Sequence, residues 1–205
     1  MKNNKIGIAV LVSGGGTNLQ ALIDAQASGI IKSGNIVCVI SSKPGVYALE
    51  RAEKAAIPAF ALDRKALGQQ QFENETARII KDCGARLIVL AGFLSILSED
   101  FIKNFPGKII NVHPALIPSF CGKGFYGLKV HEAALAYGVK LTGATVHYVN
   151  EIPDGGKIIM QKAVRIYDGD TPERLQKRVM KQAEWKILPA SAEKVCAELL
   201  KSEVK

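Results

Sequence analysis

The sequence lacks several features that mark membrane, metal-binding or disulfide-rich proteins. It has no apolar run near the ~20 residues that a membrane-spanning helix needs, and no block of like charges. No two cysteines form a pair at the spacing of a zinc or redox motif, since they stand far apart at Cys38, Cys83, Cys121 and Cys196. There is no internal repeat and no low-complexity tract. These absences predict a cytoplasmic, reduced and metal-free protein, without a signal peptide or membrane anchor.

Apolar residues and positive charge are both plentiful. Hydrophobic residues make up 48% of the 205 residues, enough for one domain over residues 1–205 whose core needs no disulfide or metal. Lys and Arg total 27 against 19 Asp and Glu, so the formal net charge is +8. Because the basic residues are scattered and not interleaved with aromatic ones, small phosphorylated or carboxylated metabolites fit this charge better than nucleic acid.

In the first part of the chain, short apolar runs alternate with stretches of helical composition. The runs predict strands and the stretches between them predict helices. Strands are expected over 6–12, 35–40, 59–62, 86–91 and 108–112, and helices over 19–27, 46–56 and 70–83. Strands that alternate with helices pair in parallel through right-handed crossovers. The predicted fold is therefore α/β, with an open, doubly wound and mostly parallel sheet.

The pattern changes after about residue 114. A Pro/Gly-rich loop is followed by a helix and then by two strands that are predicted to form a hairpin. Thr171 and Pro172 then mark a helix start. The elements expected here are a loop over 114–127, a helix over 130–137, strands over 143–149 and 157–164, a long helix ending at Ile187 before Pro189, and another helix to Leu200.

A glycine-rich loop, SGGGTN at 13–18, lies between the first expected strand and a helix. Ligands bind beyond the carboxyl ends of strands in such sheets, and glycines let backbone N–H groups approach an anion at a helix N-terminus. Thr17 and Asn18 stand where a nucleotide P-loop needs lysine and serine or threonine, and Leu19 stands where the dinucleotide pattern needs its third glycine. An anion site for one phosphate or carboxylate and a plain tight turn both remain open.

Asn111 and His113 stand two residues apart at the end of the fifth expected strand, so their side chains face one side of the sheet. An amide donor and an imidazole suit acyl transfer, because the amide stabilises an oxyanion and the imidazole moves a proton. Asp154, beside two glycines in the hairpin loop, is positioned to orient the histidine and raise its pKa. A structural histidine and a turn-forming aspartate are the alternatives, and His131 and His147 are interpreted as structural.

Five segments together resemble the folate-dependent formyltransferases. They are VSGGGTNLQALID (12–24), IVLAGFLSILS (88–98), IINVHPALIPSF (109–120), GATVHYVNEIPDGGKIIMQ (143–161) and GDTPERL (169–175), and they follow the family's order. The resemblance implies a Rossmann-like formyltransferase fold. It also implies transfer of the formyl group of 10-formyltetrahydrofolate, the co-substrate, to the amine of 5'-phosphoribosylglycinamide, the third step of de novo purine (IMP) biosynthesis. It implies these small-molecule partners, a monomer or homodimer, and no need for metal, ATP, nucleic acid or membrane.

The same resemblance implies roles for individual residues. Those matching the catalytic trio are Asn111, His113 and Asp154. Those matching the ribonucleotide site are Gly16, Thr17 and Asn18 at the phosphate and Glu184 at the ribose hydroxyls. Those matching the folate site are Leu94, Ser95, Ile96, Leu97, Asn111, Asn150, Glu151 and Arg64. Ser95 replaces a large basic residue of many relatives, and a family arginine corresponds either to Arg64 or to Gln69. Residues 1–113 are thus expected to form a phosphate-binding half, and 114–205 a folate and catalytic-loop half with the C-terminal helix.

The implied mechanism is direct transfer through a tetrahedral intermediate, whose oxygen is held by Asn111 and a protonated His113. A formyltetrahydrofolate hydrolase, in which water replaces the amine, is the alternative. Such enzymes carry a regulatory domain before the catalytic core and tend to place a second histidine where Pro114 stands, so the sequence favours the transferase. A methionyl-tRNA formyltransferase would require a further C-terminal domain, and the intact trio argues against non-catalytic folate binding.

Overall fold

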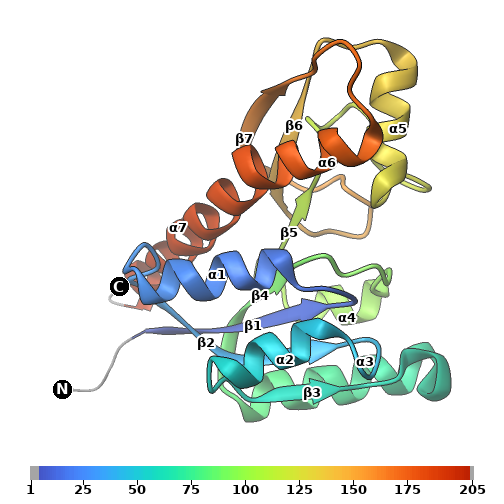
Figure 1. Cartoon of the computed structure of the whole chain (residues 1–205). Coiled ribbons are helices and arrows are strands. Elements are labelled where there is room, and N and C mark those ends of the chain that lie inside the picture. The colour runs from blue at the N-terminus through green and yellow to red at the C-terminus, as the bar shows by residue number, and fades with distance from the viewer. Residues whose placement is uncertain (1–4, 204–205) are drawn as a thin grey trace.

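The chain folds around one seven-stranded sheet (Figure 1). The structure, a computed structural model, describes residues 5–203, so positions 1–4 and 204–205 of the expected domain lie outside the described residues. The strand order is β3-β2-β1-β4-β5-β6-β7, parallel from β3 to β5, with β6 antiparallel to both of its neighbours. The strands are β1 (Ile6–Val12), β2 (Gly34–Ser41), β3 (Ala59–Ala61), β4 (Ala85–Leu90), β5 (Ile109–His113), β6 (Leu141–Tyr148) and β7 (Ile158–Arg165). The predicted α/β fold with a mostly parallel sheet is confirmed.

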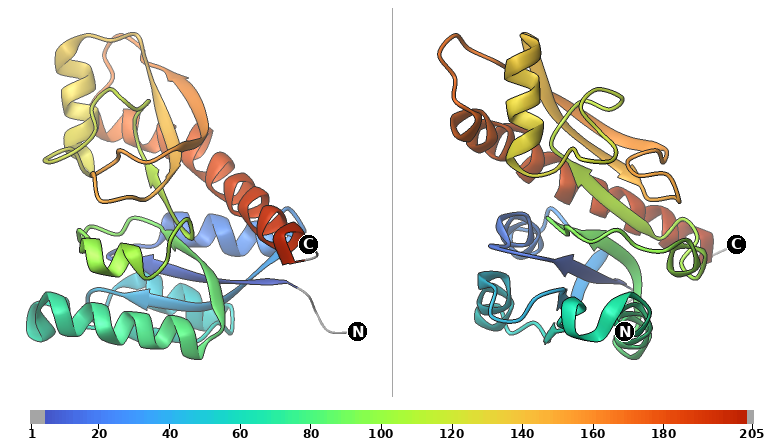
Figure 2. Two further views of the ribbon diagram at one scale, coloured as in Figure 1. Left: turned by 180° about the vertical axis from the view of Figure 1, so that it is seen from behind. Right: turned by 90° about the vertical axis from the view of Figure 1, so that its right-hand side faces the viewer.

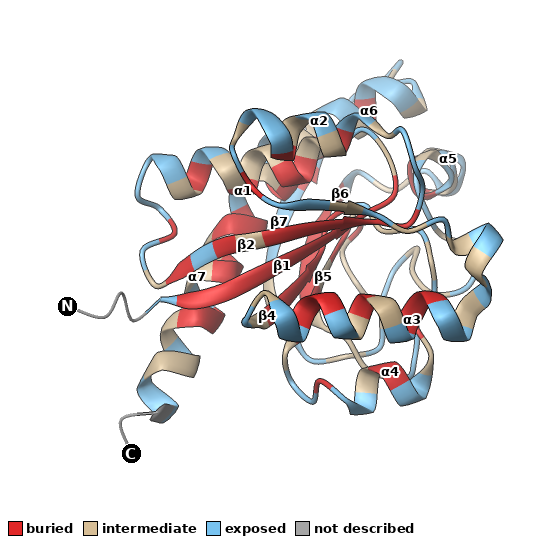
Figure 3. Ribbon diagram, turned by 90° about the horizontal axis from the view of Figure 1, so that it is seen from below, coloured by how far each residue is buried: buried red, intermediate tan, exposed pale blue. Residues whose placement is uncertain are grey.

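Helices cover both faces of this sheet, whose strands are mostly buried (Figure 3). The helices on one face share a buried apolar cluster with the strands: α1 (Thr17–Ala27), α2 (Tyr47–Lys54), α6 (Pro172–Val179) and α7 (Trp185–Glu203). The opposite face has its own cluster, to which α3 (Arg64–Asp82) and α4 (Glu99–Lys103) contribute. A further helix, α5 (Leu128–Tyr137), packs beside α6. Burial on both faces explains why the strands of the parallel part are continuous apolar runs.

α3 and α4 depart most from the sequence prediction at the start of a helix. α3 begins at Arg64 rather than Gln70, because the carboxylate of Asp63 caps it by accepting from the N–H groups of Lys65 and Ala66, and it kinks at Gly68, whose φ is 74°. α4 was not predicted. Its start is capped by Ser98, whose hydroxyl accepts from the N–H of Phe101.

Pro189 does not end a helix, contrary to the prediction. α6, a π-helical turn η1 (Met180–Glu184) and α7 follow one another directly, and Pro189 lies inside α7. A proline interrupts the regular ladder of hydrogen bonds in an α-helix. Here the preceding turn is π-helical, so the ladder is already irregular close to the proline.

α7 runs from the hairpin region back across the molecule to the loop between α1 and β2 (Figure 2). There the carboxylate of Glu193 accepts from the N–H groups of Lys32 and Ser33, at 2.7 and 2.8 Å, and from the hydroxyl of Ser33 at 2.8 Å. The last helix is therefore attached to the first crossover of the sheet. Within residues 5–203, no helix is both long and apolar enough to cross a membrane.

The order of the strands reverses between β1 and β4, the point at which ligands bind in open α/β sheets. The loops that follow these two strands meet there, since the N–H of Leu94 donates to the hydroxyl of Ser13 at 3.0 Å. β5, the next strand in the sheet, carries Asn111 and His113 at its carboxyl end. The fold thus places three sequence-predicted segments along one edge of the sheet.

Candidate active site

Asn111 and His113 lie where β5 meets β6, the first antiparallel neighbour in the sheet. Asn111 stands opposite His147 and His113 stands opposite Thr145 in this pair of strands. Because side chains alternate along a strand, Asn111, His113 and His147 share one face. Asn111 is half-buried and both histidines are buried.

Both ring nitrogens of His113 face oxygen atoms. Nε2 lies 2.8 Å from the carbonyl oxygen of Phe120, and Nδ1 lies 3.5 Å from Oδ2 of Asp154. A carbonyl oxygen can only accept, so Nε2 carries a proton. A second proton, at Nδ1, would create an ion pair with Asp154. His113 and Asp154 thus lie within ion-pair distance of each other, and the loop over 114–127 supplies the other contact.

His147, interpreted from the sequence as structural, belongs to the same cluster. Its Nδ1 lies 2.8 Å from the carbonyl oxygen of Tyr148 and so carries a proton, which leaves Nε2 to accept from Nδ2 of Asn111 at 3.2 Å. The same Nε2 lies 3.5 Å from Oδ1 of Asp154. An amide nitrogen has two N–H groups, so Asn111 keeps a second donor. The sequence places His147 on a strand, but only the register with β5 brings it to Asn111.

Asp154 connects the two histidines and is held by the backbone. Its Oδ2 accepts from the N–H of Gly122 at 2.9 Å, and its φ of 57° lies in the left-handed region that residues other than glycine rarely adopt. Burial alone would raise the pKa of Asp154, but its contact with His147, the charge of His113 and the N–H of Gly122 together lower it below its ordinary value. Asp154 is therefore a carboxylate at neutral pH.

The expectation that the pKa of His113 is raised is wrong for this structure. Burial of the imidazole lowers the pKa, and this effect exceeds the opposing effects of the Asp154 carboxylate and the Phe120 carbonyl. Because its pKa lies below the ordinary value, His113 is mostly neutral at pH 7, with its proton on Nε2. The prediction considered the carboxylate but could not include the loss of solvent around the ring.

The glycine loop is held by α2 in a way that turns its N–H groups outward. The carbonyl of Gly14 accepts from the N–H of Ala48 at 3.2 Å, and the carbonyl of Gly15 accepts from Nε of Arg51 at 2.9 Å. In a trans peptide the N–H points opposite to the carbonyl, so the N–H groups of Gly15 and Gly16 point away from α2. They adjoin the N-terminus of α1, which has no side-chain cap. Outward N–H groups beside an uncapped helix N-terminus are suited to binding an anion.

Gly16 is required for a different reason from the one expected. From the sequence, a side chain at this position should block the anion. In the structure, Gly16 has a φ of 71°, and an added Cβ would lie 2.7 Å from Cβ of Ala48. A substitution would therefore strain the backbone and collide with α2. Around Gly14 and Gly15, by contrast, a Cβ would meet no atom within 4 Å in the part of the chain that the structure describes.

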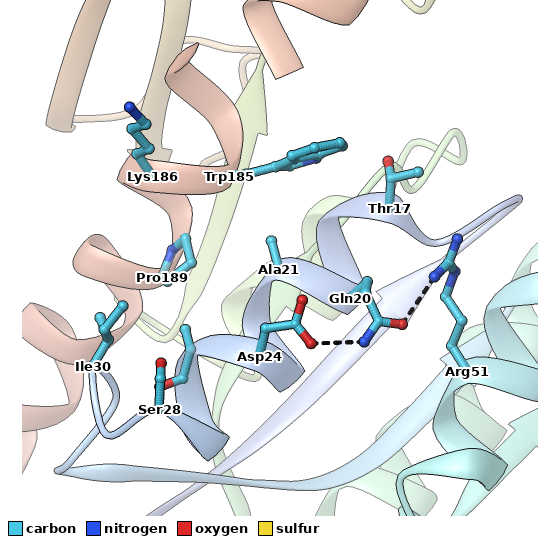
Figure 4. Close-up of a pocket in the computed structure, with 11 residues that line it drawn as sticks. Thr17, Gln20, Ala21, Asp24, Ser28, Ile30, Arg51, Trp185, Lys186 and Pro189 are labelled. Carbon is cyan, nitrogen blue, oxygen red and sulfur yellow. Dashed lines mark hydrogen bonds between the residues drawn. The ribbon is translucent and has the colours of Figure 1, made fainter. Parts of the chain in front are cut away.

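Asn18 and Glu184 are brought together although 166 residues separate them. Nδ2 of Asn18 donates to Oε2 of Glu184 at 2.7 Å, and both side chains are buried. Burial raises the pKa of Glu184, with the Asn18 amide acting in the opposite direction. Beside this pair, a groove of about 550 Å³ lies between α1 and the start of α7, with Thr17 at one end (Figure 4). The ribonucleotide residues predicted from the sequence thus lie together.

The segment matched to the folate site presents apolar side chains at the surface. Leu94 and Ile96 are 58% and 67% exposed, Ser95 is half-buried and Leu97 is buried. The segment is anchored from α3 by Glu73, a buried carboxylate that accepts from the N–H of Ser98 at 2.7 Å and from the hydroxyl of Ser98 at 2.5 Å. Exposed apolar side chains on a fixed backbone are typical of a binding surface.

Arg64 and Gln69, between which the sequence left the family's arginine undecided, contact each other across the kink in α3. Nε of Arg64 donates to Oε1 of Gln69 at 3.0 Å, and Nε2 of Gln69 donates to the carbonyl of Ile96 at 3.1 Å and to Glu73. The guanidinium therefore lies near the 94–97 segment. The two other matched residues are in the hairpin loop, where Glu151 is exposed and Oδ1 of Asn150 accepts from the N–H of Ile152 at 3.2 Å.

The chain is similar to known proteins of one family along most of its length. A profile of the family described as "Formyl transferase" matches residues 6–191. Phosphoribosylglycinamide formyltransferase of Haemophilus influenzae is 41% identical over 183 residues, which cover 89% of this chain and 83% of that protein. The crystal structure of glycinamide ribonucleotide transformylase 1 from Symbiobacterium toebii is 36% identical, with a TM-score of 0.88 over 97% of this chain and 90% of that one.

Longer proteins match as well. The trifunctional purine biosynthetic protein adenosine-3 of Gallus gallus is 43% identical over 198 residues, which are 96% of this chain and 19% of that protein. The chain therefore spans about a fifth of the length of these trifunctional relatives.

Proposed function

The chain belongs to the formyl transferase family, and from that membership we propose that it formylates the amine of 5'-phosphoribosylglycinamide with 10-formyltetrahydrofolate. The products would be the N-formyl ribonucleotide and tetrahydrofolate, as in the third step of de novo purine synthesis. The observation that carries this proposal is the cluster of Asn111, His113, His147 and Asp154 at the carboxyl end of β5. Similarity over most of the length of relatives named for this reaction supports it.

The reaction exchanges one bond for another at the formyl carbon. The amine nitrogen bonds to this carbon, the bond from the carbon to N10 of the folate breaks, the amine loses one proton and N10 gains one. The free N–H of Asn111 is placed to stabilise the oxygen of the tetrahedral intermediate. For His113 to donate to substrate, its Nε2–H has to leave the carbonyl of Phe120. We therefore expect the 114–127 loop to shift when substrates bind.

The two substrates would occupy opposite sides of this cluster. Gly16, Thr17 and Asn18 would hold the phosphate through backbone N–H groups, and Glu184 the ribose. The exposed apolar residues Leu94 and Ile96 would contact the folate, with Ser95, Leu97, Asn150, Glu151 and Arg64 around it. Both halves, 1–113 and 114–205, would then act as one domain. The net charge of +8 favours two anionic substrates.

The deciding experiment measures deformylation of 10-formyltetrahydrofolate by the purified protein with and without the ribonucleotide amine. We expect deformylation only when the amine is present, together with an equal amount of formylated ribonucleotide. Equal rates with and without the amine would identify a hydrolase and contradict the proposal. His113→Ala should lower the rate by at least about 100-fold while ribonucleotide binding is kept. We further propose a cytoplasmic location and a monomer or homodimer.

A further inference from the structure

Trp185 carries a buried hydrogen-bond donor without a partner. It is the only tryptophan in the sequence and the first residue of α7. The indole ring lines the groove between α1 and α7, but its Nε1–H is buried and has no hydrogen-bond partner among residues 5–203. An unpaired buried N–H is destabilising, and the N–H of a buried tryptophan usually has a partner. An acceptor from a ligand would remove this penalty.

Two residues near Trp185 have oxygen atoms that can accept further hydrogen bonds. Glu184 directly precedes Trp185, and its carboxyl group can accept more hydrogen bonds than the one from Asn18. Asn18 is 7% exposed, and its Oδ1 is buried without a partner in the described part of the chain. The starts of α1 and α7 therefore carry one unpaired donor, the N–H of Trp185, and two acceptors with free capacity, on Glu184 and Asn18.

The groove lies beside these residues, and Trp185 is one of the residues that line it. Thr17, Gln20 and Arg51 line one side, and Trp185 and Lys186 line the other. The side chain of Trp185 extends across the groove toward Thr17 (Figure 4). Thr17 is the first residue of α1, directly after the glycine loop with its outward N–H groups. A phosphate at this loop would therefore place the rest of its molecule within reach of Trp185.

The chemistry of the free groups selects a hydroxyl rather than a phosphate oxygen. A hydroxyl accepts and donates at once, so it can satisfy the indole N–H and an acceptor on Glu184 or Asn18 together. A phosphate oxygen can only accept. The indole donor is buried, so no water has to be removed from it, but the ring or its neighbours have to shift for a ligand hydroxyl to reach it.

We propose that Trp185 is a specificity-determining residue of the ribonucleotide site, whose indole N–H donates to a sugar hydroxyl that in turn donates to Glu184 or Asn18. This rests on the proposed function, in which the same site holds a phosphorylated ribose. The backbone N–H groups of the glycine loop bind the phosphate, and Trp185 recognises the sugar. The two contacts can therefore be separated by experiment.

The test compares two probes, ribose 5-phosphate and inorganic phosphate, by calorimetry on the wild type and on Trp185→Phe. Phenylalanine keeps an aromatic ring in the groove but removes the donor. We expect ribose 5-phosphate to bind about three- to tenfold more weakly, and the affinity for inorganic phosphate to be unchanged. Lys194→Met, at an exposed position of α7 that does not line the groove, should leave both affinities unaltered. Thermal unfolding of each variant checks the fold.

An equal loss for both probes, no loss for either, or failure of the wild type to bind ribose 5-phosphate would overturn the proposal. Because Trp185 is the only tryptophan, its fluorescence in the wild type should change with ribose 5-phosphate and not with inorganic phosphate. These measurements involve no formyl transfer. A protein that discriminates the sugar but transfers no formyl group would contradict the proposed function alone, and the reverse result would contradict this inference alone.

Discussion

Burial and a carboxylate act in opposite directions on the protonation of His113. Burial lowers the pKa of the imidazole and Asp154 raises it, with burial the larger effect. Asp154→Asn removes the larger of the two effects that raise the pKa and leaves that of the Phe120 carbonyl, so the pKa of His113 should fall further below its ordinary value. The charged ring would then appear only at lower pH than in the wild type. Titration of the histidine by NMR in both proteins measures the shift.

Asp168→Asn is a suitable control, because this exposed aspartate lies outside the cluster and should leave the titration of His113 unchanged. The rate of Asp154→Asn should fall by about 100-fold or more. The double variant His113→Ala, Asp154→Asn should be little slower than the slower single one, since the two residues act as a unit. An unchanged pKa of His113 in Asp154→Asn would mean that the carboxylate acts only as a turn residue.

The sequence identified most of this cluster but not its electrostatics. The two-residue spacing of Asn111 and His113 was enough to place them on one face of a strand. His147 was interpreted as structural because no local pattern shows which residue stands opposite Asn111. The low pKa of His113 depends on how many atoms cover the ring. Register and burial are both properties of the packed chain, so a local pattern does not contain them.

At the scale of single elements, α3 controls the segment that follows β4. Glu73 accepts from both the N–H and the hydroxyl of Ser98, and Ser98 also caps α4. Glu73→Gln replaces one carboxylate oxygen by a donor, which would face a donor of Ser98. We expect the KM for the folate to rise about tenfold, since the 94–97 segment would lose its fixed position. The KM for the ribonucleotide should stay unchanged.

Glu75→Gln is the matched control on the same helix. Glu75 is partly exposed and pairs with Arg78 at the surface, so its replacement should alter neither KM. Steady-state kinetics with each substrate varied in turn give both values. A Glu73→Gln protein with a lowered melting temperature but an unchanged KM for the folate would show that Glu73 serves stability alone.

The helices were harder to predict from the sequence at their ends than at their centres. α4 follows Ser98, Glu99 and Asp100, a capping residue and two acidic residues that are typical of a helix start. The sequence therefore contains a local signal for the start of α4. Pro189, by contrast, led to a wrong prediction of a helix end. The π-helical turn that precedes it packs against β6 and β7, and such packing cannot be read from the local sequence.

For the whole molecule, a buried histidine makes stability depend on pH. His131 is fully buried in α5, and burial lowers its pKa to about 4, with a smaller contribution from His113. In the unfolded chain its pKa is near 6.5. Between these values the unfolded state binds more protons, so the free energy of unfolding should fall as the pH drops from 6.5 to 4. The expected loss is about 3 kcal/mol.

His131→Leu should remove this part of the dependence, leaving a smaller loss that arises from His113. Both ring nitrogens of His131 have no hydrogen-bond partner among the described residues, so leucine breaks no bond that the structure contains. Urea unfolding of both proteins at several pH values gives the comparison. If the free energy of unfolding fell equally in the two proteins across this pH range, its pH dependence could not be assigned to His131.

The overall architecture followed from the alternation of strands and helices, but the strand order did not. The strand order reverses between β1 and β4, and β6 lies antiparallel beside β5. Both features depend on contacts between residues that are far apart in the sequence. The resemblance predicted that Asn18 and Glu184 serve one substrate. That they contact each other follows only from the path of α7 across the first crossover.

The bond between Asn18 and Glu184 also has a consequence for the order in which the protein is made. A ribosome adds about 5–20 residues per second, so roughly 10–30 s pass between the synthesis of these two residues. During this interval the nascent chain can already form the glycine loop and its first strands, while Glu184, the partner of Asn18, has not been translated. If the chain binds a ribonucleotide as proposed, the contacts to the sugar can stabilise it only after translation has passed residue 184.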